Sequence, residues 1–224
     1  MTVSTFFSQA SAQQTIMHDA YITRDTDPTN NTWASFRTGA GTGNSYNSTQ
    51  LLARIMSGSS AWIVFHRSQI MYNTADIGTD NITEAKWESV GRGTSAVDYF
   101  TASVTLCASN PTNNHYSISS DYANIGTTKY SDDLALASQT YDNTTYTTFN
   151  MNAAGIAAIN KTGITKLGII IKEDFDNQEP TETNVYGNMS QWQCWSTDET
   201  ESADVRPRLV ITHSSPFTPK AIIF

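Results

Sequence analysis

Alternation of apolar and polar side chains at every second position constrains the fold of this chain more than any other feature. The pattern is clearest in YFTASVTLC, residues 99–107, where apolar side chains recur at alternate positions. Successive side chains of a β-strand point to opposite faces of a sheet, so this run predicts a strand with one face toward a core. RPRLVITH, residues 206–213, predicts a second such strand, with Leu209 and Ile211 pointing inward.

Two further segments carry bulky side chains on both faces. AWIVFHRSQI, residues 61–70, and ITKLGIIIKED, residues 164–174, are apolar at neighbouring as well as at alternate positions. Such runs are typical of central strands that other elements cover on both sides. The chain is also rich in Thr, Ser, Asn and Tyr and only 15% charged, a composition that favours strands and turns over helices. The sequence therefore predicts an all-β fold, an antiparallel β-sandwich.

Only one segment has the periodicity of a helix, NMNAAGIAAINKTG at residues 150–163. Asn150 or Asn152 can cap its start, and Gly163 can end it in a left-handed conformation. We expect this one short helix to plug an end of the sandwich. The residues predicted to share one face of the helix are Ala153, Ile156, Ala157 and Ile159.

The remaining sequence reads as loops and two arms around one domain. We place the β-sandwich domain at residues 17–213, an N-terminal arm at 1–16 and an extended tail at 214–224. Gly, Asn, Asp, Thr and Pro mark the longest connections, because these residues favour turns. The stretches expected to form loops or irregular edge strands are 24–50, 108–133 and 173–188.

The tail combines prolines with apolar side chains. Pro216 and Pro219 favour an extended chain, and a free apolar strand is an aggregation hazard unless it docks. We therefore expect the tail to add to a sheet edge, in this subunit or in a neighbour, with folding back on its own domain as the alternative, and we expect a homo-oligomer. The residues assigned to assembly are Phe217, Ile222, Ile223 and Phe224.

Charge and hydropathy exclude several classes of partner. The chain carries 13 basic and 21 acidic residues, a net charge of −8, so it lacks the positive surface that nucleic acid or anionic lipid requires. No run approaches the roughly 18–20 apolar residues of a membrane span. Cys107 and Cys194 are too few for a disulfide scaffold and lack the spacing of a zinc site. Packed thiols are favoured, and a disulfide between the two cysteines is the alternative.

No catalytic constellation is visible in the sequence. The histidines stand outside any HExxH or GxSxG motif, the glycines of GAGTGN at 39–44 lack nucleotide-binding spacing, and no carboxylate pair for glycoside hydrolysis can be picked out. We therefore predict that the protein is not an enzyme. The histidines assigned to packing or hydrogen bonding are His18, His66, His115 and His213.

Calcium is the only cofactor that the sequence suggests. DFDNQE, residues 174–179, offers closely spaced oxygen ligands of the kind that calcium takes, although no Gly follows at the EF-hand turn position. Apart from calcium, we predict no cofactor. The candidate metal ligands are Asp174, Asp176, Asn177 and Glu179.

Glycans are a second class of ligand that the sequence allows. Exposed aromatic rings stack on sugar faces, and neighbouring amides and carboxylates take the hydroxyl groups. The candidate aromatic residues, all in polar segments, are Trp33, Tyr46, Tyr116, Tyr122, Tyr130 and Tyr186. The aromatic residues assigned instead to strands and core are Trp62, Trp87, Trp192 and Trp195.

The order of these segments resembles the DNRLRE-type β-sandwich, also classed with carbohydrate-binding module family 96. The similar segments are HDAYITRDTDPTNNTW, ARIMSGSSAWIVFHRSQI, DNITEAKWESV, FNMNAAGIAAINKTGITKLGIIIKED and the closing SADVRPRLVITH, spread from about residue 17 to 213. Two positions depart from the family pattern: His66 replaces an Asp after Phe65, and His213 replaces a terminal Tyr. The resemblance implies a jelly-roll-like sandwich of the kind found in extracellular carbohydrate-binding appendages, cell-surface proteins and phage virion proteins.

Two functions are expected from this combination. The first is a non-enzymatic structural protein of a virion, a phage capsid-decoration or fibre component that contacts other virion proteins or copies of itself. The alternative is a carbohydrate-binding module or adhesin, extracellular or at a cell surface, that recognises surface glycans. Because one fold serves both roles, the choice depends on the surface and not on the sandwich.

Overall fold

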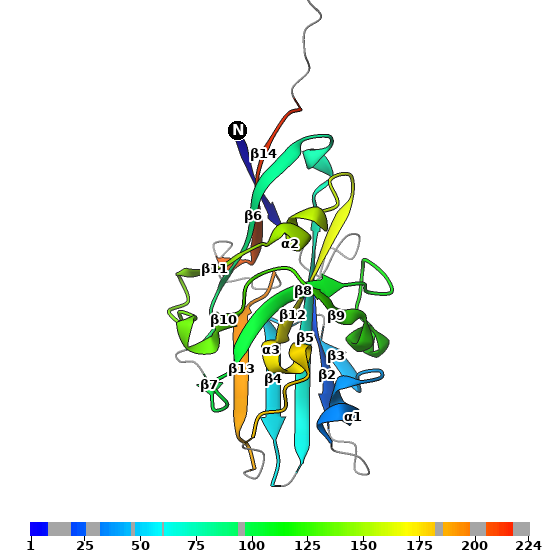
Figure 1. Cartoon of the computed structure of the whole chain (residues 1–224), viewed down its shortest axis with the longest axis vertical. Coiled ribbons are helices and arrows are strands. Elements are labelled where there is room, and N and C mark those ends of the chain that lie inside the picture. The colour runs from blue at the N-terminus through cyan, green and yellow to red at the C-terminus, as the bar shows by residue number, and fades with distance from the viewer. Residues whose placement is uncertain are drawn as a thin grey trace, which may run out of the picture.

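The alternating runs fold into two antiparallel sheets that pack against each other, as Figure 1 shows for the computed structural model of the chain. The prediction of an all-β sandwich is confirmed. No helix in the described part of the chain is long and apolar enough to cross a membrane. The structure describes residues 1–8, 19–25, 32–45, 48–59, 61–93, 97–181, 186–197 and 205–216.

The smaller sheet has four strands. Its inner face carries one row of apolar side chains across all four strands, in which Phe6, Leu209, Trp87 and Phe149 are successive cross-strand partners. The inward orientation predicted for Leu209 is therefore confirmed, since its side chain is fully buried. In order across the sheet, the strands are β1 (Thr2–Phe7), β14 (Arg208–Ser214), β6 (Asn81–Val90) and β11 (Tyr146–Asn150).

The larger sheet has ten strands. Its main path is β10 (Leu134–Ala135), β8 (Ser103–Ser109), β12 (Ile164–Ile171), β5 (Trp62–Asn73), β4 (Gln50–Ser57), β13 (Met189–Trp195) and β7 (Val97–Asp98). Three strands lie off this path: β2 (Asp19–Asp25) pairs with β5 and with β3 (Gly43–Ser45), and β9 (Ile125–Lys129) pairs with β8.

Strand β5 is central, as its two-sided apolar pattern predicts, and one of its edges pairs with two different strands in succession. Residues 64–66 pair with β2 and β4, whereas residues 68–70 pair with β2 and β12, so β4 and β12 use the same edge in succession. Where the partner of β5 changes from β4 to β12, the Ser68 hydroxyl accepts a hydrogen bond from the Leu52 N–H (2.9 Å) and donates one to the Leu52 carbonyl (2.7 Å). Ser68 thus satisfies the backbone of β4 where its ladder to β5 ends.

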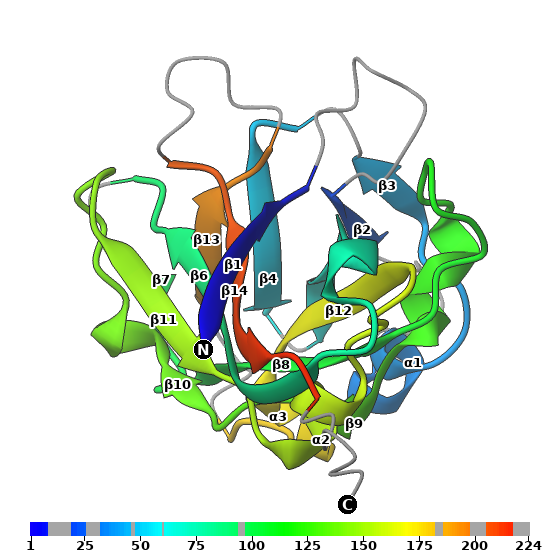
Figure 2. The same ribbon diagram turned by 90° about the horizontal axis from the view of Figure 1, so that it is seen from above.

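The core contains two aromatic clusters. Between the sheets, Trp87 packs on Trp192 at 5.6 Å between ring centroids, and the Trp87 indole N–H donates to the Tyr72 hydroxyl. Viewed from above in Figure 2, β1 and β14 lie over β4 and β13. Trp62, Trp87 and Trp192 are fully buried as predicted. The residues of the second cluster, on β5 and the segments covering it, are Trp33, Phe36, Trp62, Phe65 and Phe100.

A helix forms where the sequence predicts one, but the face of the helix that is buried differs from the predicted face. Helix α2 (Ala153–Ala157) begins after Asn152, whose side-chain oxygen accepts from the Gly155 N–H at 2.9 Å. Ala153 and Ala157 are exposed, and Gly155 is the buried position. A Cβ at Gly155 would lie 2.5 Å from the Tyr130 carbonyl oxygen, so the helix approaches its neighbour through the residue without a side chain.

The expectation of a single helix was wrong. Two more five-residue helices, α1 (Trp33–Arg37) and α3 (Lys172–Asp176), lie in stretches that the sequence assigned to loops. Each spans too few residues to show a 3.6-residue period. Short 3-10 helices also occur at Ala75–Ile77, Ser119–Asn124 and Leu136–Ser138.

The strand predicted over 99–107 is displaced along the chain. Strand β8 covers Ser103–Ser109, and the residues before it form a loop in which Thr101 has a φ of 52°. The sequence predicts one core face for this strand, but the second face of β8 is covered as well, because Thr105 and Cys107 are fully buried. Cys107 and Cys194 are both free, buried thiols, so the disulfide alternative is wrong.

Part of the predicted N-terminal arm belongs to the smaller sheet. Strand β1 pairs with β14 from Thr2 opposite His213 to Phe7 opposite Arg208. Strand β14 continues to Ser214, the first residue of the predicted tail. The four residues assigned to assembly lie outside the described residues; they are Phe217, Ile222, Ile223 and Phe224.

Candidate ligand-binding site

A surface hollow of about 390 Å³ lies between the loop that joins β7 to β8 and the segment that follows α3. We call it the Tyr99 hollow. Its volume lies within the range of about 300–1,000 Å³ that is usual for small-ligand sites. The residues that line it are Tyr99, Phe100, Thr101, Glu173, Glu179, Pro180 and Thr181.

The aromatic side of the Tyr99 hollow is held by a fixed loop. The Asp98 carboxylate accepts hydrogen bonds from the Ala102 N–H (2.8 Å) and the Ser190 hydroxyl (2.8 Å), which ties the loop to β13. Tyr99 is 46% exposed and meets the Phe100 ring edge-to-face at 5.4 Å, and Phe100 in turn packs on buried Trp62. An exposed tyrosine ring is thereby presented on a supported backbone.

The other side of the hollow carries two carboxylates. Glu173, in the first turn of α3, accepts a hydrogen bond from the Ser103 N–H at 3.3 Å, and partial burial raises the pKa of its carboxyl group. Glu179 accepts a hydrogen bond from the Trp62 indole N–H at 2.7 Å. No ion pair within the described part of the chain involves either glutamate. Both carboxylates therefore keep oxygen lone pairs that can accept hydrogen bonds from a ligand.

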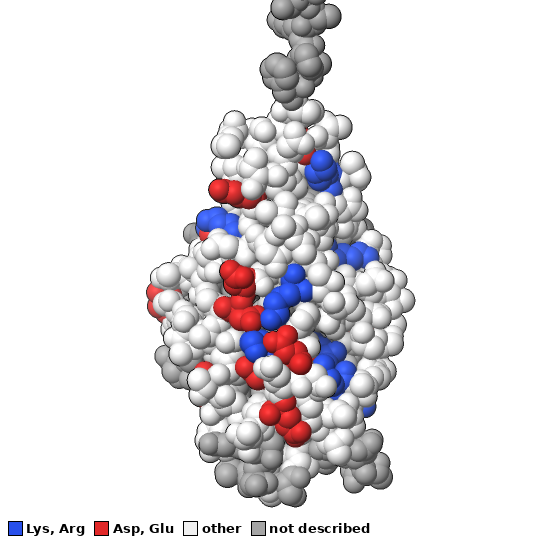
Figure 3. Space-filling model, viewed as in Figure 1, with Lys and Arg blue, Asp and Glu red and all other residues white. Residues whose placement is uncertain are grey.

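Charged side chains gather on the face that Figure 3 shows, which includes α3 and β8. The two lysines that contact α3 residue Asp176 are already paired. Lys172 contacts Asp176 at 3.0 Å, and Lys129 contacts Asp133 at 2.9 Å and Asp176 at 3.5 Å. These pairs leave the two glutamates as the acceptors of the hollow, and the site favours hydroxyl or amide donors over anions.

The structure scatters the aromatic residues predicted for glycan binding. Trp33 and Tyr122 are buried: the Trp33 indole donates to Asn177, and the Tyr122 hydroxyl donates to the Phe36 carbonyl. Tyr130 is half-buried against the core. Tyr116 and Tyr186 are 52% and 72% exposed, but neither lines the Tyr99 hollow. Tyr46 lies outside the described residues.

The four predicted calcium ligands are likewise not brought together. Asp174 is buried against Arg67, Asp176 pairs with two lysines, Asn177 accepts from Trp33, and Glu179 accepts from Trp62. Among the described residues, no group of three or more His, Cys, Asp or Glu side chains could hold a metal ion. Each of these four side chains therefore has a structural partner of its own.

Arg67 and Asp174 form the buried centre that holds α3 in place. The guanidinium contacts both carboxylate oxygens at 2.8 Å and also donates to the carbonyls of Tyr122 (3.0 Å) and Arg37 (3.2 Å). Burial alone would lower the pKa of Arg67, but the neighbouring Asp174 outweighs it and raises that pKa further above its ordinary value. The pair joins β5 to α3, the helix that carries Glu173.

A second polar surface runs across β4 and β13, but its groups satisfy one another. Arg54 donates to the Gln191 side-chain oxygen at 2.6 Å, and Gln191 donates to Gln193. Gln193 (2.8 Å) and Arg92 (2.6 Å) both donate to the Gln50 side-chain oxygen. We assign this row to holding the two strands together, because its principal donors and acceptors are already used.

Two of the described histidines serve packing or hydrogen bonding, as the sequence predicts. His213 bridges Asp80 (2.7 Å) and Ser4 (2.8 Å), which joins β14 to β1 and to the start of β6. His66 is buried beside the Tyr21 ring, and burial, aided by the positive charge of Arg54, lowers its pKa to about 3. His115 is exposed, and His18 lies outside the described residues.

The sequence missed the Tyr99 hollow for an identifiable reason. Tyr99 stands in the run 99–107 that the sequence assigns to an alternating strand, Glu173 begins the stretch 173–188 assigned to loops, and Glu179 is one of the candidate metal ligands. No protein-family model matches the chain. No curated protein is similar to it in sequence either. The function is therefore inferred from the geometry of the hollow.

Proposed function

We propose that the protein is a non-enzymatic glycan-binding module and that the Tyr99 hollow is its sugar site. The observation that carries the proposal is the meeting of an exposed tyrosine ring with two carboxylates, free of ion pairs within the described residues, in one hollow. Sugars present an apolar C–H face and a rim of hydroxyl donors, and these two surfaces match a ring and a pair of acceptors. The resemblance to the carbohydrate-binding family 96 sandwich supports the same assignment.

The site favours neutral glycans. In this proposal, the Tyr99 ring stacks on one sugar face while Glu173 and Glu179 accept hydroxyl hydrogen bonds. The net charge of −8 and the two carboxylates repel sulfated or uronic sugars. Because burial raises the pKa of Glu173, affinity should begin to fall on acidification at a higher pH than for an ordinary glutamate.

A glycan array probed with the full chain tests the proposal, followed by calorimetry on whichever neutral glycan binds. Tyr99→Ala should weaken binding at least tenfold, whereas Tyr99→Phe should retain most of the affinity because it keeps the ring. Tyr186→Ala is the matched control, since that ring is exposed outside the hollow. Absence of neutral-glycan binding, or equal losses in Tyr99→Ala and Tyr186→Ala, would remove the proposal.

The same glycans should be assayed for release of reducing sugar. Glycoside hydrolases also use two carboxylates, one of them with a raised pKa. We expect no release. Release by the full chain that disappears in both Glu173→Gln and Glu179→Gln would replace binding with hydrolysis as the function.

A structural component of a phage particle is the second candidate function. The observation that favours it is an open strand edge on β6 beside a partly apolar groove, which suits assembly through protein contacts. Glycan binding and a place on the outside of a particle are compatible roles for one sandwich. Detection of the chain at stoichiometric levels in purified particles would support this candidate, and its absence from them would exclude it.

A further inference from the structure

Strand β6 has an open edge over its first residues. Strand β11 pairs with β6 only from Lys86 to Val90, and the Met151 N–H closes the contact by donating to the Ala85 carbonyl at 2.9 Å. Over Asn81–Glu84, the only strand neighbour of β6 within the described chain is β14, on the opposite edge. This stretch therefore presents backbone groups to which another strand could add.

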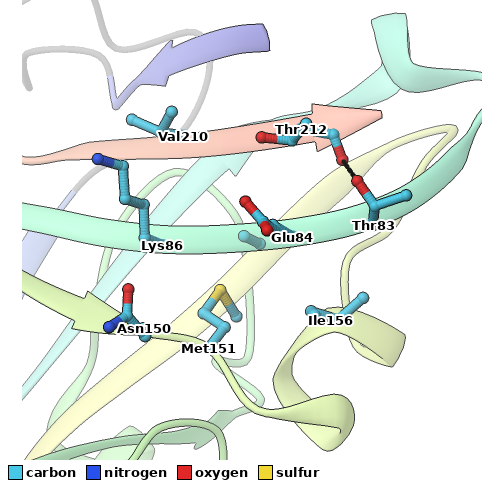
Figure 4. A pocket seen from close by; sticks show the side chains of 9 residues that line it. Thr83, Glu84, Lys86, Asn150, Met151, Ile156, Val210 and Thr212 are labelled. Carbon is cyan, nitrogen blue, oxygen red and sulfur yellow. Dashed lines mark hydrogen bonds between the residues drawn. The ribbon is translucent and has the colours of Figure 1, made fainter. Parts of the chain in front are cut away.

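A groove with both apolar and polar lining residues accompanies the open edge. Two hollows, of about 410 and 220 Å³, lie between β6 and α2 and share Ile156 as a lining residue; Figure 4 shows the larger one. We call them together the β6 groove. Ile82 and Ile156 are partly buried against the core, and Ile159 is buried. The apolar side chains that line the groove are Ile82, Ala85, Met151, Ile156, Ala157, Ile159 and Val210.

The larger hollow of the β6 groove also carries a negative charge without a counter-ion, whereas Lys161, which lines the smaller hollow, donates to the Asp80 carbonyl at 2.9 Å. Glu84 is exposed and makes no ion pair with another described residue. The neighbouring Lys86 is held by Glu88 at 2.6 Å. An occupant of the groove would therefore be extended and apolar, with one cation able to approach Glu84.

Residues 217–224 of this chain, FTPKAIIF, have that chemistry. Lys220 supplies the cation, and the four residues after it are apolar. Strand β14 ends at Ser214, opposite Asn81, on the edge of β6 that faces away from the open one. To reach that open edge in its own subunit, the chain would have to cross the end of β6 and reverse its direction within residues 215–219.

We propose that residues 220–224 of a second copy of this chain add as a strand along Asn81–Glu84 and place Ile222, on the same strand face as Lys220, against the β6 groove. Lys220 of that copy lies near Glu84. The contact joins identical chains, by mutual exchange in a dimer or by successive addition in a longer assembly. It goes beyond glycan binding, because the β6 groove and the Tyr99 hollow share no lining residue.

Sedimentation velocity of the full chain over a range of concentrations is the first test. The wild-type chain should self-associate, and I222D/I223D and Ala157→Arg should each weaken association at least tenfold. Ala154→Arg is the matched control, since it places the same side chain on an exposed position of α2 outside the lining of the groove. Circular dichroism confirms that each variant is folded.

Mixing the two defective chains identifies the contact. Ala157→Arg keeps its tail but blocks its groove, whereas I222D/I223D keeps its groove but spoils its tail. Differently tagged, they should co-purify with each other but not with themselves. A monomeric wild-type chain, unchanged association in either variant, an Ala154→Arg defect as large as that of Ala157→Arg, or failure of the two chains to complement would overturn the proposal.

Discussion

Replacing Asp174 by Asn should lower the free energy of unfolding, because Asp174 holds α3 beside the Tyr99 hollow. The substitution keeps the shape of the side chain but removes the negative charge that faces Arg67. Both side chains are nearly inaccessible to solvent, with 5% and 2% of their surface exposed. The guanidinium would then remain buried beside one amide and two backbone carbonyls, with no counter-charge.

The expected cost follows from the contacts. Arg67 makes two charge-assisted hydrogen bonds to Asp174, both at 2.8 Å, and an amide can replace only one acceptor. Breaking a buried ion pair from one side costs about 3–5 kcal/mol. A domain is stable by only about 5–15 kcal/mol, so this substitution should remove a large part of the free energy of unfolding.

Urea unfolding followed by tryptophan fluorescence measures the effect. Asp176→Asn is the control, because it lies on the same helix but pairs with half-exposed lysines and should cost under about 1 kcal/mol. The double variant Arg67→Met with Asp174→Leu should lose less stability than Asp174→Asn alone, since no buried charge remains. A cost below about 1 kcal/mol for Asp174→Asn, or a double variant less stable than it, would refute the reasoning.

Three further outcomes follow from single residues. Ser68→Ala should lower the free energy of unfolding, measured by urea unfolding, by about 1–3 kcal/mol, because both buried backbone groups of Leu52 lose their hydrogen-bond partner. A cost below about 0.3 kcal/mol would show that these backbone groups find another partner. Cys107, whose pKa burial raises to about 12, should not react with a thiol reagent until denaturant is added, and fast native labelling would contradict its burial. Between pH 6.5 and about 3, the unfolded chain binds a proton at His66 and the folded chain does not, so the free energy of unfolding should decrease as the pH is lowered, by up to about 1.4 kcal/mol per pH unit. His66→Gln should remove this part of the pH dependence, and an unchanged dependence would show that His66 is not its source.

The sequence predicted those strands whose side-chain pattern reports the two faces directly. In β14, Leu209 and Ile211 are buried and Val210 is half-exposed, because a period of two maps onto the faces of any sheet with one covered side. The change of partner along one edge of β5 could not be foreseen in this way. Ser68 looks like any polar residue within a strand, and its role depends on Leu52, a residue of another strand.

The binding aromatics were harder to predict than the core because exposure depends on tertiary contacts. Trp33 stands in a polar stretch but is buried, since α1 folds it against Trp62. Tyr99 stands in an alternating run but is exposed, since the chain turns at Thr101 before β8 begins. The hollow itself combines residues 99–101 with residues 173–181, and no local pattern links these segments.

The place of β14 within the smaller sheet also sets when that sheet can be completed during synthesis. Strand β14 is the last described strand to leave the ribosome, yet it lies between β1, the first, and β6. Until residues 208–214 have been made, β1 has no partner and β6 lacks its longest neighbour. A nascent chain therefore carries unpaired strand edges until β14 has been made, a state in which chaperones or adjacent nascent copies can engage it first.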